Sequence, residues 1–107
     1  MQFVSEEEIE MLSKMSGVEI LDAIKGIPFE EKSRIPDDSG VYVLTRLDWE
    51  QYIGSCYSII IRIRHHHIKP IETIDVYLTN NIESDYLKLE QWFIHEISIA
   101  MKNIWTL

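Results

Sequence analysis

The sequence GVYVLTRLDWEQYIG at residues 40–54 decides the fold of this chain. Residues 40–46 are rich in β-branched and aromatic side chains, which favour strands. Residues 47–48 fit a turn, and residues 49–54 return to a strand-like composition. Because the connection between the two segments is so short, we expect them to pair as an antiparallel hairpin.

The segments after the hairpin predict one further strand and a long helix. Residues 72–79 alternate polar and apolar side chains, as a half-buried strand does. Ser84 is a good N-cap residue, and residues 85–103 have helical apolar spacing. Residues 58–64 fit either structure, because their isoleucines favour a strand whereas a helix would place Ile59, Arg62, Ile63 and His66 on one side.

The segments before the hairpin predict two helices and a loop. Ser5 and Glu8 have the spacing of a capping box that opens a helix, and Gly17 interrupts that helix. Residues 18–25 predict a second helix, which ends at Gly26. Residues 28–39 have the proline, aspartate and serine content of a loop.

The order of these elements indicates an α+β fold around a small, mostly antiparallel sheet. The chain has 107 residues and a net charge of −8, and this charge is unevenly placed. Residues 1–38 contain ten acids and four bases, whereas residues 39–107 contain eight acids and six bases. We therefore divide the chain into an acidic helical extension, residues 1–38, packed on a core domain, residues 39–107.

Composition excludes several classes of protein. The acidic charge argues against an indiscriminate polyanion binder, and the one cysteine excludes an intrachain disulfide or a cysteine-rich zinc site. No apolar run approaches the roughly 20 residues of a membrane span, so we expect no membrane partner. Because the N-terminus is acidic where a targeting peptide is basic, we expect a cytoplasmic protein.

One acid stands in an unusual place. In the last predicted helix, Glu90 interrupts an apolar stripe that includes Leu87, Phe93 and Ile94. An ionised carboxylate facing a core is costly unless it is paired or bound to a cation. Glu90 is therefore either an acid at the edge of the stripe, reaching water or an arginine, or a metal ligand or catalytic acid.

Several motifs in order resemble the GIY-YIG endonuclease family. The paired signature matches Gly40-Val41-Tyr42 and Tyr52-Ile53-Gly54, with Val41 in the isoleucine position. The later family elements, an arginine, a histidine, a glutamate in an apolar helix and a closing asparagine, match Arg62, His66, Glu90 and Asn103. The resemblance covers roughly residues 38–103.

This resemblance implies a fold and an activity. The family fold has a three-stranded antiparallel sheet flanked by helices, so residues 57–67 are expected to be helical. The implied activity is metal-dependent endonucleolytic hydrolysis of DNA phosphodiester bonds, at structured or distorted DNA. Glu90 would hold Mg²⁺ or Mn²⁺, and Arg62 would bind the phosphate oxygens.

The resemblance also implies roles for the remaining motif residues. Tyr42 would act as general base or orient the water, which requires a cationic neighbour to lower its pKa from about 10. Tyr52 and His66 would assist, with Asn103 as a supporting hydrogen-bond group. Gly40 and Gly54 would allow close backbone approach. Further phosphate contacts are expected from Arg46, Arg64 and Lys69.

Two other functions stay open at this point. The chain is alternatively a catalytically inactive module of the same fold that binds a protein or nucleic acid, or an acidic mimic of DNA. In the nuclease interpretation, the charge predicts weak, salt-sensitive DNA binding, with added affinity from a protein partner or a homodimer.

Overall fold

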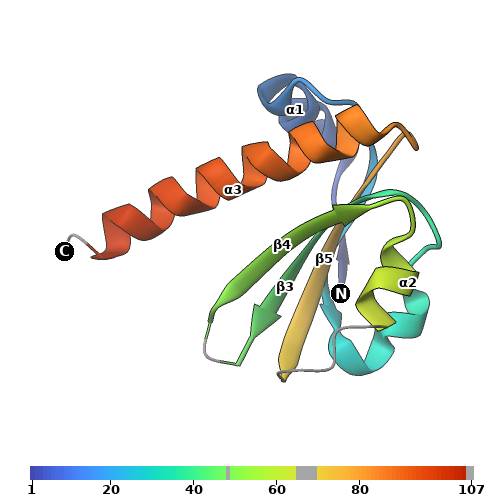
Figure 1. Ribbon diagram of the computed structural model, residues 1–107, viewed down its shortest axis with the longest axis vertical. Helices are drawn as coiled ribbons and strands as arrows, with labels where there is room; N and C mark the ends of the chain where they lie inside the picture. The colour runs from blue at the N-terminus through green and yellow to red at the C-terminus, as the bar shows by residue number, and fades with distance from the viewer. Residues whose placement is uncertain (48, 65–69, 106–107) are drawn as a thin grey trace.

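The computed structural model of the protein describes residues 1–47, 49–64 and 70–105, with side chains as far as residue 97. Figure 1 shows a twisted sheet with helices on both of its faces. The elements in chain order are β1 (Gln2–Phe3), α1 (Glu6–Ser16), β2 (Ile20–Pro28), the 3₁₀ segment η1 (Phe29–Arg34), β3 (Gly40–Arg46), β4 (Gln51–Cys56), α2 (Ile59–Arg64), β5 (Ile71–Thr79) and α3 (Glu83–Trp105).

The α+β class is confirmed, but the expected three-stranded sheet with a helical extension is wrong. The described residues form a five-stranded sheet in the order β1-β2-β5-β3-β4, in which every neighbouring pair is antiparallel. The two additional strands come from the N-terminal part of the chain. β2 pairs with β5 along almost its whole length, and β1 adds a two-residue edge.

The helix expected at residues 18–25 is wrong, and irregularities in β2 explain the error. The register between β2 and β5 shifts between Ile20 and Asp22 and again between Ile24 and Ile27. Each shift adds a residue to β2, as a β-bulge does. Ile20 and Ala23 consequently share one core cluster, and Ile24 and Ile27 share the other. This spacing of three residues imitates helical periodicity within a strand.

The hairpin expected at residues 40–54 is confirmed, with its second strand at Gln51–Cys56. β3 is the central strand of this half of the sheet, because it pairs with β4 on one side and β5 on the other. Tyr42 lies opposite Gly54 in β4 and opposite Val76 in β5. The hairpin therefore carries the two predicted motifs on adjacent strands in direct register.

Alternation along β3 divides the core into two clusters. Tyr42 and Leu44 face α2 and belong to the cluster that contains Ile59 and Ile63. Val41 and Val43 face the opposite side and pack with Leu89 and Phe93 of α3, in a cluster that the side chains of α1 also contact. Within the described residues, no helix is both long and apolar enough to cross a membrane.

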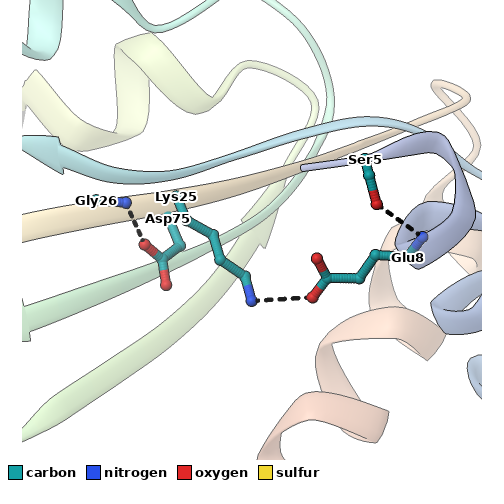
Figure 2. A network of polar contacts seen from close by, with 5 residues as sticks. All are labelled: Ser5, Glu8, Lys25, Gly26 and Asp75. Atoms are coloured by element: carbon teal, nitrogen blue, oxygen red, sulfur yellow. Dashed lines mark hydrogen bonds and ion pairs between the residues drawn. The ribbon is translucent and has the colours of Figure 1, made fainter. Parts of the chain in front are cut away.

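A polar network joins α1 to the bulge in β2 (Figure 2). The Ser5 hydroxyl caps α1 by accepting the Glu8 N–H at 3.2 Å, and the Glu8 carboxylate pairs with the Lys25 ammonium at 3.3 Å. Beside Lys25, the Asp75 carboxylate accepts the Gly26 N–H at 2.8 Å. Asp75 thus provides an acceptor for a backbone donor at the bulge, where regular strand pairing is interrupted.

We predict that Gly40→Ala destabilises the protein by about 3 kcal/mol or more. Gly40 has φ +152°, and a Cβ atom there would overlap the carbonyl oxygen of Tyr77. The measurement is the midpoint of urea unfolding. The control is Gly26→Ala, where φ is +68° but no atom lies within 4 Å of the added Cβ. Backbone strain alone should cost about 1–2 kcal/mol there, so equal losses in the two variants would contradict the prediction.

The ionisation of Asp75 is predicted to lower stability as pH rises. Burial raises the pKa of Asp75, although the Gly26 N–H and Lys25 oppose the shift. Because the folded-state pKa lies above the unfolded value of about 3.9, the carboxyl group contributes stability below pH 4 that is lost as pH rises through the raised pKa.

Urea unfolding of the wild type and Asp75→Asn, measured at a series of pH values between pH 3 and pH 8, tests this prediction. The free energy of unfolding of the wild type should fall relative to the variant from about pH 4 upward and then level off. Asp75→Ala, which leaves the Gly26 N–H without this acceptor, should cost about 1 kcal/mol more than Asp75→Asn. If the free energy of unfolding of the wild type instead rises relative to that of Asp75→Asn as pH increases, the predicted direction is wrong.

Candidate functional site

The short helix α2 presents Arg62 on the surface. Its isoleucines Ile59, Ile60 and Ile63 are buried, so the helical period leaves Arg62 and Arg64 exposed. The helical interpretation of this segment is therefore confirmed for residues 59–64. The start of α2 is anchored to the loop before β3, because the Ser58 hydroxyl donates to the Asp37 carboxylate and the Ile59 N–H donates to the Asp38 carbonyl at 3.0 Å.

The long helix α3 places Glu90 at the flank of its buried stripe. Leu89 and Phe93 are the buried residues, whereas Leu87 and Ile94, which were expected to face the core, are exposed. Figure 1 shows α3 crossing the sheet over β4, with its C-terminal half extending past the sheet. Glu90 is half-buried, and it forms no ion pair with any residue in the described part of the chain.

The two signature tyrosines lie side by side on one face of the hairpin. Their ring centroids are 6.2 Å apart, with 29° between the planes. The ring of Tyr42 lies across Gly54 of the neighbouring strand, where a Cβ atom would overlap the phenol. The absence of a side chain at Gly54 therefore leaves room for the aromatic ring, which covers the strand at this point.

The tyrosines differ in exposure. Tyr42 is 1% exposed, whereas Tyr52 is 51% exposed on the edge strand β4. Burial raises the pKa of Tyr42, and the proximity of Tyr52, Cys56 and Glu90 raises it further, while Arg62 lowers it. The lowered pKa that a general base at Tyr42 would require is therefore not found, because loss of solvent outweighs the effect of the arginine.

These electrostatic interactions also show that four predicted residues come together. Tyr52, Arg62 and Glu90 all lie close enough to Tyr42 to influence its ionisation. Tyr42 belongs to the core on the α2 face, and Leu89, the neighbour of Glu90, belongs to the core on the α3 face. Both α2 and α3 contact β4, the outer strand of the sheet. The four residues therefore lie on elements that adjoin this edge of the sheet.

Other predicted residues are not part of this group. Arg46 lies four residues beyond Tyr42 along β3, about 13 Å away at 3.3 Å per residue, and its guanidinium pairs with Glu50 at 2.5 Å. Arg64 is exposed at the end of α2. His66 and Lys69 fall outside the described residues, as does the side chain of Asn103.

Cys56 lies in the site although the motifs did not indicate it. The thiol is buried, and burial raises its pKa, with Arg62 and Glu90 both close enough to act on it. The neutral thiol serves here as a packing group on the face of Tyr42. The sequence could have indicated this position, because Cys56 lies two residues after Gly54 and residues two apart in a strand lie on the same face.

A site for a divalent cation would rest on Glu90. The described residues contain no group of three or more histidine, cysteine, aspartate or glutamate side chains that would enclose a metal ion. Mg²⁺ is commonly held by one or two carboxylates together with waters and substrate phosphate. A half-buried carboxylate on a long helix fits this open type of site and does not fit a closed protein cage.

Comparison of the chain with protein-family models, curated proteins and solved structures finds no match.

We predict that Gly54→Ala destabilises the protein by about 1–3 kcal/mol, because the methyl group would displace the buried ring of Tyr42. A double-mutant cycle with Tyr42→Leu, measured by urea unfolding, tests the cause. Without the ring, the added methyl group should cost less than half as much as it does in the wild type. An unchanged cost would mean that Gly54 is required for another reason.

Proposed function

We propose that this protein is a small, divalent-metal-dependent endonuclease of the GIY-YIG type that hydrolyses DNA phosphodiester bonds. The observation that carries the proposal is the convergence of Tyr42, Tyr52, Arg62 and Glu90 on one edge of the sheet. These residues come from four separate elements, β3, β4, α2 and α3. Arg62 and Glu90 each form no ion pair within the described residues, so pairing with a neighbour does not explain either charge.

Each residue has a chemical role that its position supports. Arg62 is exposed and always charged, and its planar guanidinium can donate two hydrogen bonds to phosphate oxygens. Glu90 offers carboxylate oxygens as ligands for Mg²⁺ or Mn²⁺. When bound, the cation supplies charge that stabilises the phosphate and the leaving oxygen.

The proposed reaction is simple hydrolysis. A water oxygen bonds to phosphorus as the bond from phosphorus to the 3′-oxygen breaks, which leaves a 5′-phosphate and a 3′-hydroxyl. The water gives up a proton to solvent, and the 3′-oxygen takes one up. In this scheme Arg62 neutralises negative charge on the oxygens of the phosphate. The carboxylate of Glu90 would hold the divalent cation next to that phosphate.

The charge distribution supports weak, salt-sensitive DNA binding. Arg62 and Arg64 are the exposed bases next to the site, and each phosphate contact they make contributes a salt-dependent term. In the extension, Lys14, Lys25 and Arg34 already pair with acids of that same segment. Added affinity would come from a protein partner or a second copy of the chain. The proposed location stays the cytoplasmic one that the acidic N-terminus suggests.

The central test is cleavage of supercoiled plasmid and branched DNA in Mg²⁺, in Mn²⁺ and in EDTA. The wild type should nick DNA only with a divalent cation, and Glu90→Gln should reduce the rate by about 10²-fold or more. Glu96→Gln changes an exposed acid on the same helix, so it controls for charge and should cleave like the wild type. Arg62→Lys should be impaired because it keeps the charge without the planar fork.

Circular dichroism of each variant would establish that it is folded. A folded wild type that cleaves none of these substrates, under any of the metal conditions, contradicts the endonuclease proposal. Retained DNA binding without cleavage would favour the inactive interaction module instead.

A further inference from the structure

We infer that Tyr52, and not Tyr42, is the tyrosine whose hydroxyl contacts the DNA phosphate, and that Tyr42 is a positioning residue beneath it. This inference rests on the proposed function and specifies how the two signature residues divide their roles. The resemblance alone gives the reacting role to Tyr42. The geometry of the site reverses that assignment.

Burial excludes Tyr42 from direct contact with a polymer. The residue is 1% exposed, and its phenol lies across the backbone of Gly54. The ring of Tyr52 lies beside it, with the two ring centroids 6.2 Å apart. A phosphate has little access to the buried Tyr42 side chain, whereas about half of the Tyr52 side chain is exposed to solvent.

Tyr52 has the position that a phosphate contact requires. It lies on the outer strand β4 and is 51% exposed, on the same face of the hairpin as Tyr42. Arg62, which is also exposed, lies close enough to Tyr42 to influence its ionisation. A neutral phenol can donate one hydrogen bond to a non-bridging phosphate oxygen while the guanidinium binds another.

Tyr42 then acts on the substrate through Tyr52. A tyrosine on an edge strand, half in solvent, has several accessible rotamers. The buried Tyr42 ring gives it a fixed apolar surface on which to stack, and Gly54 allows that ring to lie flat against β4. Tyr42 thereby restricts the direction in which the Tyr52 hydroxyl points.

Steady-state kinetics on plasmid nicking separate these roles. Tyr52→Phe keeps the stacked ring and removes the hydroxyl, and should lower kcat/KM by about 10²-fold. Tyr42→Phe keeps the positioning ring, and its loss should stay below about tenfold. Tyr42→Leu removes the ring and should lower kcat by more than Tyr42→Phe does. Activity in the phenylalanine variant would then show that the ring, and not the hydroxyl, is what Tyr42 contributes. Tyr57→Phe, an exposed tyrosine outside the group, serves as the unaffected control.

A second measurement does not depend on cleavage. Acetylation of the wild type by N-acetylimidazole, read by peptide mass spectrometry, should modify Tyr52 and Tyr57 and spare the buried Tyr42 and Tyr77. A short DNA duplex added in EDTA should protect Tyr52 from the reagent. Protection of Tyr52 supports the inference, and its absence contradicts it.

The outcomes distinguish this inference from the proposed function. Metal-dependent nicking that is lost in Glu90→Gln but unchanged in Tyr52→Phe would overturn the inference and leave the endonuclease proposal intact. Equal losses in Tyr42→Phe and Tyr52→Phe would also overturn it, because the buried hydroxyl would then be needed as much as the exposed one. Absence of cleavage together with protection of Tyr52 would overturn only the proposed activity.

Discussion

The burial of β3 on both faces is the constraint on which the rest of the structure depends. This strand pairs with a neighbour on both of its edges and contributes side chains to both core clusters. Each of its side chains is therefore confined to one face of the sheet. A register slip of one residue would exchange Tyr42 with Val41 and disrupt both cores at once. Gly40 strengthens the constraint, because only a residue without a Cβ allows the strand to start so close to the Tyr77 carbonyl.

The same constraint determines what the hairpin can present to solvent. Since residues 40–44 of β3 are buried, the exposed hairpin side chains beside them come from β4, the outer strand. The two signature tyrosines are similar in sequence but not in surroundings, because one belongs to the enclosed strand and the other to the edge. The difference in exposure between Tyr42 and Tyr52 is thus a consequence of sheet topology.

Sequence patterns predicted the local elements where one period dominates. The hairpin, β5, α1 and α3 were all recognisable, and the isoleucines of α2 were assigned correctly through the motif that contains Arg62. Hydrophobic periodicity gave the wrong prediction at β2, because two register shifts there leave the buried residues three apart. These pairs are Ile20 with Ala23, and Ile24 with Ile27. Such shifts are produced by pairing with β5, a distant segment, so periodicity within β2 itself does not contain them. Exposure at the site was equally non-local, since neither tyrosine motif indicates which strand becomes the edge.

The corrected topology also changes the role of the acidic N-terminal segment. With β2 paired to β5 from Ile20 to Pro28, the segment is part of the sheet that supports the site, and it covers an edge of β5 that would otherwise have unpaired backbone groups. One acid of the segment supports this arrangement, because Glu8 pairs with Lys25, and Asp75 of β5 accepts the Gly26 N–H at the bulge that follows. The segment that carries most of the negative charge is therefore an integral part of the sheet, while Arg62 and Arg64 of α2 are exposed on the surface.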